Sequence, residues 1–142
     1  MSATILAVDD DPNFRAVVRG LLQKDADVEL VGEAENGEDA VSFVRNLRPD
    51  VVLMDLTMPR VDGFEATKRI KSYQPEIKVI VLTIHAGSEF EQASISTGAD
   101  AFIVKKRLSS ELLPTIHGLL SKDPNRAGIR DPAQTKDNLR NL

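Results

Sequence analysis

The segment Val51-Val52-Leu53-Met54-Asp55 decides the fold of this 142-residue chain, because four consecutive apolar residues stop at a carboxylate. A short apolar run without polar alternation is typical of a strand that is buried on both faces, as in a parallel sheet. Similar runs elsewhere also end at a polar side chain: residues 4–8 before Asp9, 79–82 before Thr83 and 101–104 before Lys105. A weaker run at 28–31 is a fifth candidate strand.

Longer segments with helical periodicity separate these runs. Asp11 and Pro12 have the residue types that begin a helix, with Asp11 as the N-cap. The apolar face of this first helix is expected to consist of Phe14, Val17, Val18, Leu21 and Leu22. Further helices are predicted at about 40–47, 64–73, 88–96 and, with Ser110 as the cap, 111–120. Gly98 is expected at a helix end that requires a positive φ.

The alternation of strands and helices predicts a single-domain α/β fold for residues 1–121, with a five-stranded parallel sheet and five helices on both of its faces. Right-handed crossovers leave few topologies for such a sheet. Its ligand site is expected beyond the carboxyl ends of the strands. Residues 122–142, with Asp-Pro pairs and mixed charge, are expected to be a linker or a disordered tail.

The composition excludes several classes of function. The absence of Cys excludes disulfides and thiolate metal sites, and two His residues far apart in the sequence make no obvious zinc site. A net charge of −4 disfavours unspecific nucleic-acid binding, so no direct contact with nucleic acid is expected. The chain has no basic leader and no apolar run near the roughly 20 residues that span a membrane, so a cytoplasmic location without membrane contact is expected.

Polar groups with a common chemistry follow four of the predicted strands. Asp9 and Asp10 follow the first strand, Asp55 the third, Thr83 the fourth and Lys105 the fifth. Three carboxylates at one sheet edge would repel one another, so a cation is expected between them, most plausibly Mg²⁺ because all the ligands are oxygens. An ammonium group and a hydroxyl suit the remaining oxygens of a phosphoryl group. The pattern indicates transient phosphorylation of a carboxylate by in-line attack.

These motifs resemble the response-regulator receiver family over roughly residues 3–120. The matching segments are Val8-Asp9-Asp10-Asp11, Leu53-Met54-Asp55-Leu56-Thr57-Met58-Pro59, Asp62-Gly63, Leu82-Thr83, and Gly98-Ala99-Asp100-Ala101-Phe102-Ile103-Val104-Lys105. The resemblance implies a flavodoxin-like sheet with strand order 2-1-3-4-5. It also implies that Asp55 is the phosphoacceptor in a magnesium site. Asp10 and Asp55 would be direct ligands, Asp9 would act through water, and Thr57 would offer its backbone carbonyl.

The resemblance further implies a switch. Thr83 would bond a phosphoryl oxygen and move on activation, Lys105 would pair with another oxygen, and Phe102 would turn inward as Thr83 moves. The sequence departs from the common family pattern in that Lys106 replaces a frequent Pro, Ile84 replaces a small residue, and Phe102 has no hydroxyl. A bulky residue at position 84 resembles the branch of receivers with helix-turn-helix outputs.

The leading hypothesis is a phosphorylation-controlled switch, not an enzyme, that assists its own phosphotransfer and dephosphorylation. Its donor would be a sensor histidine kinase or a phosphotransfer protein, and its contacts would lie near Phe102. The alternatives are a metal-dependent phosphohydrolase, which would be expected to carry an acid where Thr57 stands, and a pseudo-receiver that takes no phosphate. The output is open between a downstream protein and an output domain missing from the chain, as in a truncated DNA-binding regulator. A phosphorylation-dependent homodimer is also compatible with the resemblance.

Overall fold

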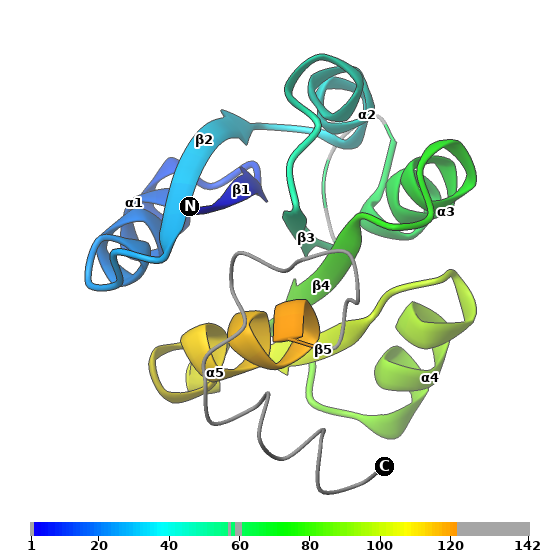
Figure 1. Cartoon of the computed structure of the whole chain (residues 1–142). Helices are drawn as coiled ribbons and strands as arrows, with labels where there is room; N and C mark the ends of the chain where they lie inside the picture. Colours follow the sequence, from blue (N-terminus) through cyan, green and yellow to red (C-terminus); the bar gives the residue numbers. More distant parts are fainter. Residues whose placement is uncertain (1, 57, 59–60, 122–142) are drawn as a thin grey trace, which may run out of the picture.

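The computed structural model describes residues 2–56, 58 and 61–121, and these form a five-stranded sheet between two layers of helices (Figure 1). The strands are β1 (Ala3–Val8), β2 (Val28–Ala34), β3 (Val51–Asp55), β4 (Lys78–Thr83) and β5 (Ala101–Val104). All neighbouring strands are parallel, in the order β2-β1-β3-β4-β5. The predicted fold class and strand order are therefore confirmed.

The helices of the described residues cover both faces of the sheet. They are α1 (Pro12–Leu22), α2 (Gly37–Leu47), α3 (Gly63–Tyr73), α4 (Ser88–Ser96) and α5 (Leu108–Ser121), with a 3-10 turn, η1 (Lys105–Arg107), before α5. Helices α1 and α5 pack on one face, and α2, α3 and α4 pack on the other (Figure 1). Within the described part of the chain, no helix has the length and apolar character needed to cross a membrane.

Strand β3 shows why an uninterrupted apolar run is needed. Successive side chains of a strand point to opposite faces of the sheet. Val51 and Leu53 belong to the core under α1 and α5, whereas Val52 and Met54 belong to the core under α2 and α3. None of the four is more than 1% exposed. The run ends at Asp55 because the strand there reaches the edge of the apolar core.

Helix caps were predicted with mixed success. The Asp11 carboxylate accepts a hydrogen bond from the Asn13 amide at 2.9 Å and caps α1, as predicted. Ser110 as the cap of the last helix was wrong, because η1 turns the chain early and leads directly into α5 at Leu108. The Ser110 hydroxyl instead donates to the carbonyl of Arg107.

Two further sequence predictions differ from the structure. Strand β2 continues to Ala34 rather than ending at residue 31, because its backbone stays paired with β1 as far as Val8. Val17 was placed on the buried face of α1 but is 54% exposed, since Val18 and Leu22 are the residues of α1 that pack into the core. Gly98 does have the expected positive φ, at 103°.

Candidate functional site

The polar residues that end the strands meet in one cleft at the carboxyl edge of the sheet. Asp9, Asp10, Asp55, Thr83 and Lys105 all line this cleft of about 240 Å³, together with Asp11, Ile84 and His85. The parallel topology brings them together, because β1, β3, β4 and β5 all end at the same edge. The predicted acids, Thr83 and Lys105 are therefore neighbours in space, whereas the predicted switch residue Phe102 does not line the cleft. Thr57, the predicted source of a backbone ligand, lies outside the described residues.

Lys105 bridges two of the acids. Its Nζ lies 2.7 Å from Oδ2 of Asp9 and 3.3 Å from Oδ1 of Asp55. The ring of Phe14, in the first turn of α1, lies against the same ammonium group, 4.0 Å from Nζ to the ring centroid. Burial alone would lower the pKa of Lys105, but the hydrogen bond and charge of Asp9 and Asp55 outweigh it, so this pKa is raised. Lys105 is therefore a fixed positive charge beside Asp55.

The acids carry more charge than Lys105 neutralises. Carboxylate oxygens of Asp9, Asp10 and Asp55 lie within 4.8 Å of one another. Asp9 and Asp55 are only 3% and 7% exposed, whereas Asp10 faces solvent. Burial, followed by the charge of Asp9, raises the pKa of Asp55 to about 6 against the opposing effect of Lys105, and Asp10 adds to the rise. Ionising this carboxyl is thus costly unless a further positive charge arrives.

The donor set fits a hard divalent cation. The carboxylates of Asp9, Asp10 and Asp55 offer the oxygen ligands that Mg²⁺ takes, and they converge closely enough to share one ion. A divalent ion would also offset the charges of Asp9 and Asp10, which add to the effect of burial in raising the pKa of Asp55. Two of these acids are buried and the third is exposed, so a cation could enter from the side of Asp10 while keeping part of its water shell.

A glycine brings the start of α3 against Asp55. The amide of Gly63 donates to the carbonyl of Leu56 at 3.0 Å. A Cβ atom at position 63 would lie 2.1 Å from the backbone oxygen of Asp55, which is closer than any real contact. Asp62 caps α3 by accepting a hydrogen bond from the amide of Glu65 at 2.9 Å. The Asp62-Gly63 pair therefore has a physical role in holding the backbone next to the acid.

Thr83 presents its hydroxyl at the cleft. Its side chain is buried, and its Oγ1 accepts a hydrogen bond from the amide of His85 at 3.1 Å. Because a hydroxyl has one hydrogen and two lone pairs, this bond leaves the hydrogen of Thr83 free to donate elsewhere. Phe102 is half-buried and packs in a small cluster with Val81 and Ala99. Ile84 is 74% exposed at the rim of the cleft.

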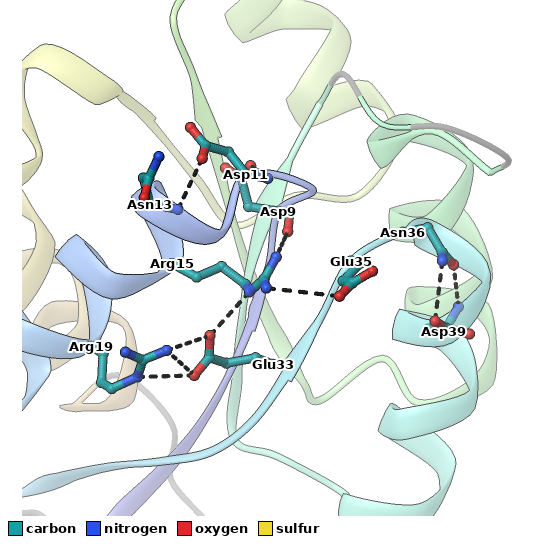
Figure 2. Close-up of polar contacts among 9 residues, drawn as sticks. All are labelled: Asp9, Asp11, Asn13, Arg15, Arg19, Glu33, Glu35, Asn36 and Asp39. Atoms are coloured by element: carbon teal, nitrogen blue, oxygen red, sulfur yellow. Dashed lines mark hydrogen bonds and ion pairs between the residues drawn. The ribbon is translucent and has the colours of Figure 1, made fainter.

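Two residues at the site were not identified from the sequence. Phe14 was assigned only to the core face of α1, although its ring contacts Lys105. Arg15 had no assigned role, yet its guanidinium donates to the backbone carbonyl of Asp9 (Figure 2). No periodicity or motif marks either contact, because each depends on how the first turn of α1 packs over the strand ends.

The comparisons with known proteins agree with this geometry. The profile of the response regulator receiver domain matches residues 5–117, and the chain belongs to this family of two-component signalling domains. It is 36% identical over 112 residues to the transcriptional regulatory protein DegU of Brevibacillus brevis, a match that covers 79% of this chain and 48% of DegU. It is 36% identical over 117 residues to the response regulator UvrY of Escherichia coli, covering 82% of this chain and 54% of UvrY.

A solved structure gives the same classification. A LuxR-family two-component response regulator from Aurantimonas sp. SI85-9A1 superposes with a TM-score of 0.81 at 29% identity, covering 98% of this chain and 99% of that one. These relatives confirm the likeness to the branch of receivers with helix-turn-helix outputs. The chain spans about half the length of the curated relatives it matches. Receiver domains of response regulators generally act as signalling switches.

Proposed function

We propose that this receiver domain takes a phosphoryl group onto Asp55 in a reaction that depends on Mg²⁺, and that the modification switches its contacts with other proteins. The observation that carries the proposal is the position of Asp55. It is a nearly buried carboxylate between a lysine and two further acids, at the mouth of an open cleft. An acid that is not a phosphoacceptor would not need a lysine and two further carboxylates around it.

The chain's own residues supply most of the chemistry. An ionised oxygen of Asp55 would attack phosphorus in line, while the bond from phosphorus to the donor, a phosphohistidine nitrogen of a histidine kinase or phosphotransfer protein, breaks. The released imidazole takes up a proton from water. Lys105, already 3.3 Å from Asp55, would pair with one phosphoryl oxygen, and the free hydrogen of Thr83 would bond another.

Magnesium would be held by Asp10 and Asp55 directly, by Asp9 through water and by the backbone carbonyl of Thr57. When bound, the ion would neutralise charge on the phosphoryl oxygens and on the acids. The geometric support is the close approach of the three carboxylates. The electrostatic support is the raised pKa of Asp55, which is caused first by burial and then by the negative charge of Asp9, so that a bound cation would favour the ionised carboxylate.

The output is proposed to run through Thr83 and Phe102. Once its hydroxyl turns to the phosphoryl group, Thr83 would vacate space into which the half-buried ring of Phe102 can rotate. The surface between α4 and β5 would then change shape and bind a downstream protein, an output domain or a second copy of the chain. Residues 122–142 are proposed as a linker or tail beyond the receiver domain, and a cytoplasmic location follows from partnership with kinases.

A phosphorylation assay tests the proposal. Wild-type protein and the variant Asp55→Asn are incubated with acetyl phosphate and Mg²⁺, and intact masses are recorded. We expect the mass of one phosphoryl group on wild type, labile to hydroxylamine, and none on the variant. Omitting Mg²⁺ should abolish the adduct. An unmodified wild type would indicate a pseudo-receiver, and a stable adduct that persists in Asp55→Asn would place the modification elsewhere.

A further inference from the structure

Arg15 reaches from the first turn of α1 to the backbone of the acidic loop, which consists of Asp9, Asp10 and Asp11 between β1 and α1 (Figure 2). Its Nη1 donates a hydrogen bond to the backbone carbonyl of Asp9, and its Nε lies 3.0 Å from Oε1 of Glu33 on β2. The side chain is only 13% exposed. An arginine held at both ends in this way has little freedom to move, so it can fix the group to which it donates.

Every polar group of Asp9 has a partner. Its amide donates to the carbonyl of Ala34 at 3.0 Å, and its Oδ1 accepts from the amide of Asp11 at 2.9 Å. Its Oδ2 binds Nζ of Lys105. The backbone carbonyl is the fourth group, and Arg15 is its partner. Asp9 is therefore clamped between β2, α1 and Lys105.

The situation of Asp10 is different. Asp10 is exposed to solvent, and its carboxylate has no hydrogen bond to any other residue that the structure describes. The carbonyl that Arg15 grips belongs to the peptide unit that joins Asp9 to Asp10, and a peptide unit is a rigid plane. The orientation of this plane fixes the position of the N–Cα bond of Asp10, from which its side chain extends. Arg15 is thus placed to restrict an acid that it does not contact.

We propose that Arg15 is a positioning residue for divalent-cation binding, acting through the peptide plane between Asp9 and Asp10. The inference rests on the proposed magnesium site and deepens it by naming what orients its exposed ligand. Outer contacts of this kind orient metal ligands, and their loss weakens metal affinity about 10–100-fold in other proteins. Arg15 would therefore affect how tightly the ion binds, not the phosphoryl transfer that follows.

Arg19 offers a matched control on the same helix. It also binds Glu33, with its Nη2 at 2.7 Å from Oε2, but within the described part of the chain its guanidinium makes no hydrogen bond to the acidic loop (Figure 2). Arg15→Gln and Arg19→Gln therefore remove the same charge from the same glutamate. Arg15→Gln also loses the 4.0 Å ion pair with the exposed Glu35, and it alone frees the carbonyl of Asp9. If Arg15 merely ties α1 to β2, the two variants should behave alike.

The experiment measures the Mg²⁺ dissociation constant of the whole chain by isothermal titration calorimetry, for wild type and both variants, with urea unfolding alongside. We expect Arg15→Gln to weaken Mg²⁺ binding about 10–100-fold and Arg19→Gln to keep the wild-type affinity. Arg15→Lys, which keeps a charge and one donor, should recover part of the loss. Phosphorylation of Arg15→Gln by acetyl phosphate should return to the wild-type rate at saturating Mg²⁺.

The outcomes separate the two proposals. Wild-type Mg²⁺ affinity in a folded Arg15→Gln, or an equal loss in both variants, overturns the role of Arg15 alone. A wild type that binds no Mg²⁺ overturns the magnesium site and with it this inference. Should Arg15→Gln fail to fold, Glu33→Gln keeps Arg15 but weakens its anchor. An intermediate loss of affinity in Glu33→Gln supports the role, and an unchanged affinity contradicts it.

Discussion

Asp55 should make the cation-free protein less stable at neutral pH than it would be with a neutral side chain there. Its pKa is raised from an ordinary 3.8 to about 6, first by burial and then by the charge of Asp9. Because the folded-state pKa is above the unfolded one, the stabilising contribution of the protonated group is complete below about pH 4 and is lost as the pH rises through about 6. Ionisation of Asp55 thus favours unfolding.

The size of the effect follows from the shift. A change from 3.8 to about 6 is about two pH units, and each unit corresponds to about 1.4 kcal/mol, so the full cost is about 3 kcal/mol. Asp55 is only 7% exposed, so solvent screens little of this cost. The variant Asp55→Asn has nearly the same shape without the charge. We expect it to be about 3 kcal/mol more stable than wild type at pH 7.5, and nearly equal to wild type near pH 4.

Urea unfolding followed by far-ultraviolet circular dichroism, in EDTA and at several pH values from 4 to 8, measures this difference. The control Glu29→Gln removes one charge from an exposed position on β2, away from the cleft, and should change little at any pH. Added Mg²⁺ should stabilise wild type more than Asp55→Asn, because the variant lacks one carboxylate of the proposed site. A variant less stable than wild type at pH 7.5, or a difference that does not vary with pH, would refute the reasoning.

Three further substitutions test other parts of the structure. Gly63→Ala should lower the free energy of unfolding in urea by about 1–3 kcal/mol or more, because the new Cβ would lie 2.1 Å from the backbone oxygen of Asp55. An unchanged free energy of unfolding would show that α3 can move away from Asp55. Ile103→Ala, at a side chain only 1% exposed, should cost about 2–5 kcal/mol in the same assay, and a cost below this range would mean that the core under α5 closes the gap. Lys105→Met should raise the pKa of Asp55 above about 6, because it removes the positive charge that opposes the rise. Carbon NMR of the Asp55 carboxyl group measures this pKa, and a lowered value would contradict the electrostatic account.

Much of the fold could be predicted because it depends on local patterns. The apolar runs identified all five strands, and the strand-helix alternation led to the parallel sheet that the structure has. Errors occurred where tertiary contacts override a local pattern. Val17 has the spacing of a core residue, but the sheet under α1 accommodates Val18 and Leu22 instead. Strand β2 extends through Gly32 and Glu33, which are poor strand residues, because β1 pairs with them.

The candidate site divides in the same way. Its residue types follow from the sequence alone, because parallel strands all end at one edge and the polar residues that follow them must meet there. On that rule Asp9, Asp55, Thr83 and Lys105 form one group, and the structure places them in one cleft. The grouping of these residues follows from the parallel direction of the strands, and no individual side-chain contact has to be known.

Only the tertiary structure decided how these residues are held. Lys105 lies closer to Asp9 than to Asp55, at 2.7 Å against 3.3 Å, and the ring of Phe14 covers its ammonium group. Arg15 grips the peptide beside Asp10. These contacts join residues from α1, β2 and the end of β5 that no local pattern relates. The physical reason is that strand and helix periodicity depends on residues that are close together in the sequence. The distances from the ammonium group of Lys105 to its two carboxylates depend instead on how whole strands and helices pack against one another.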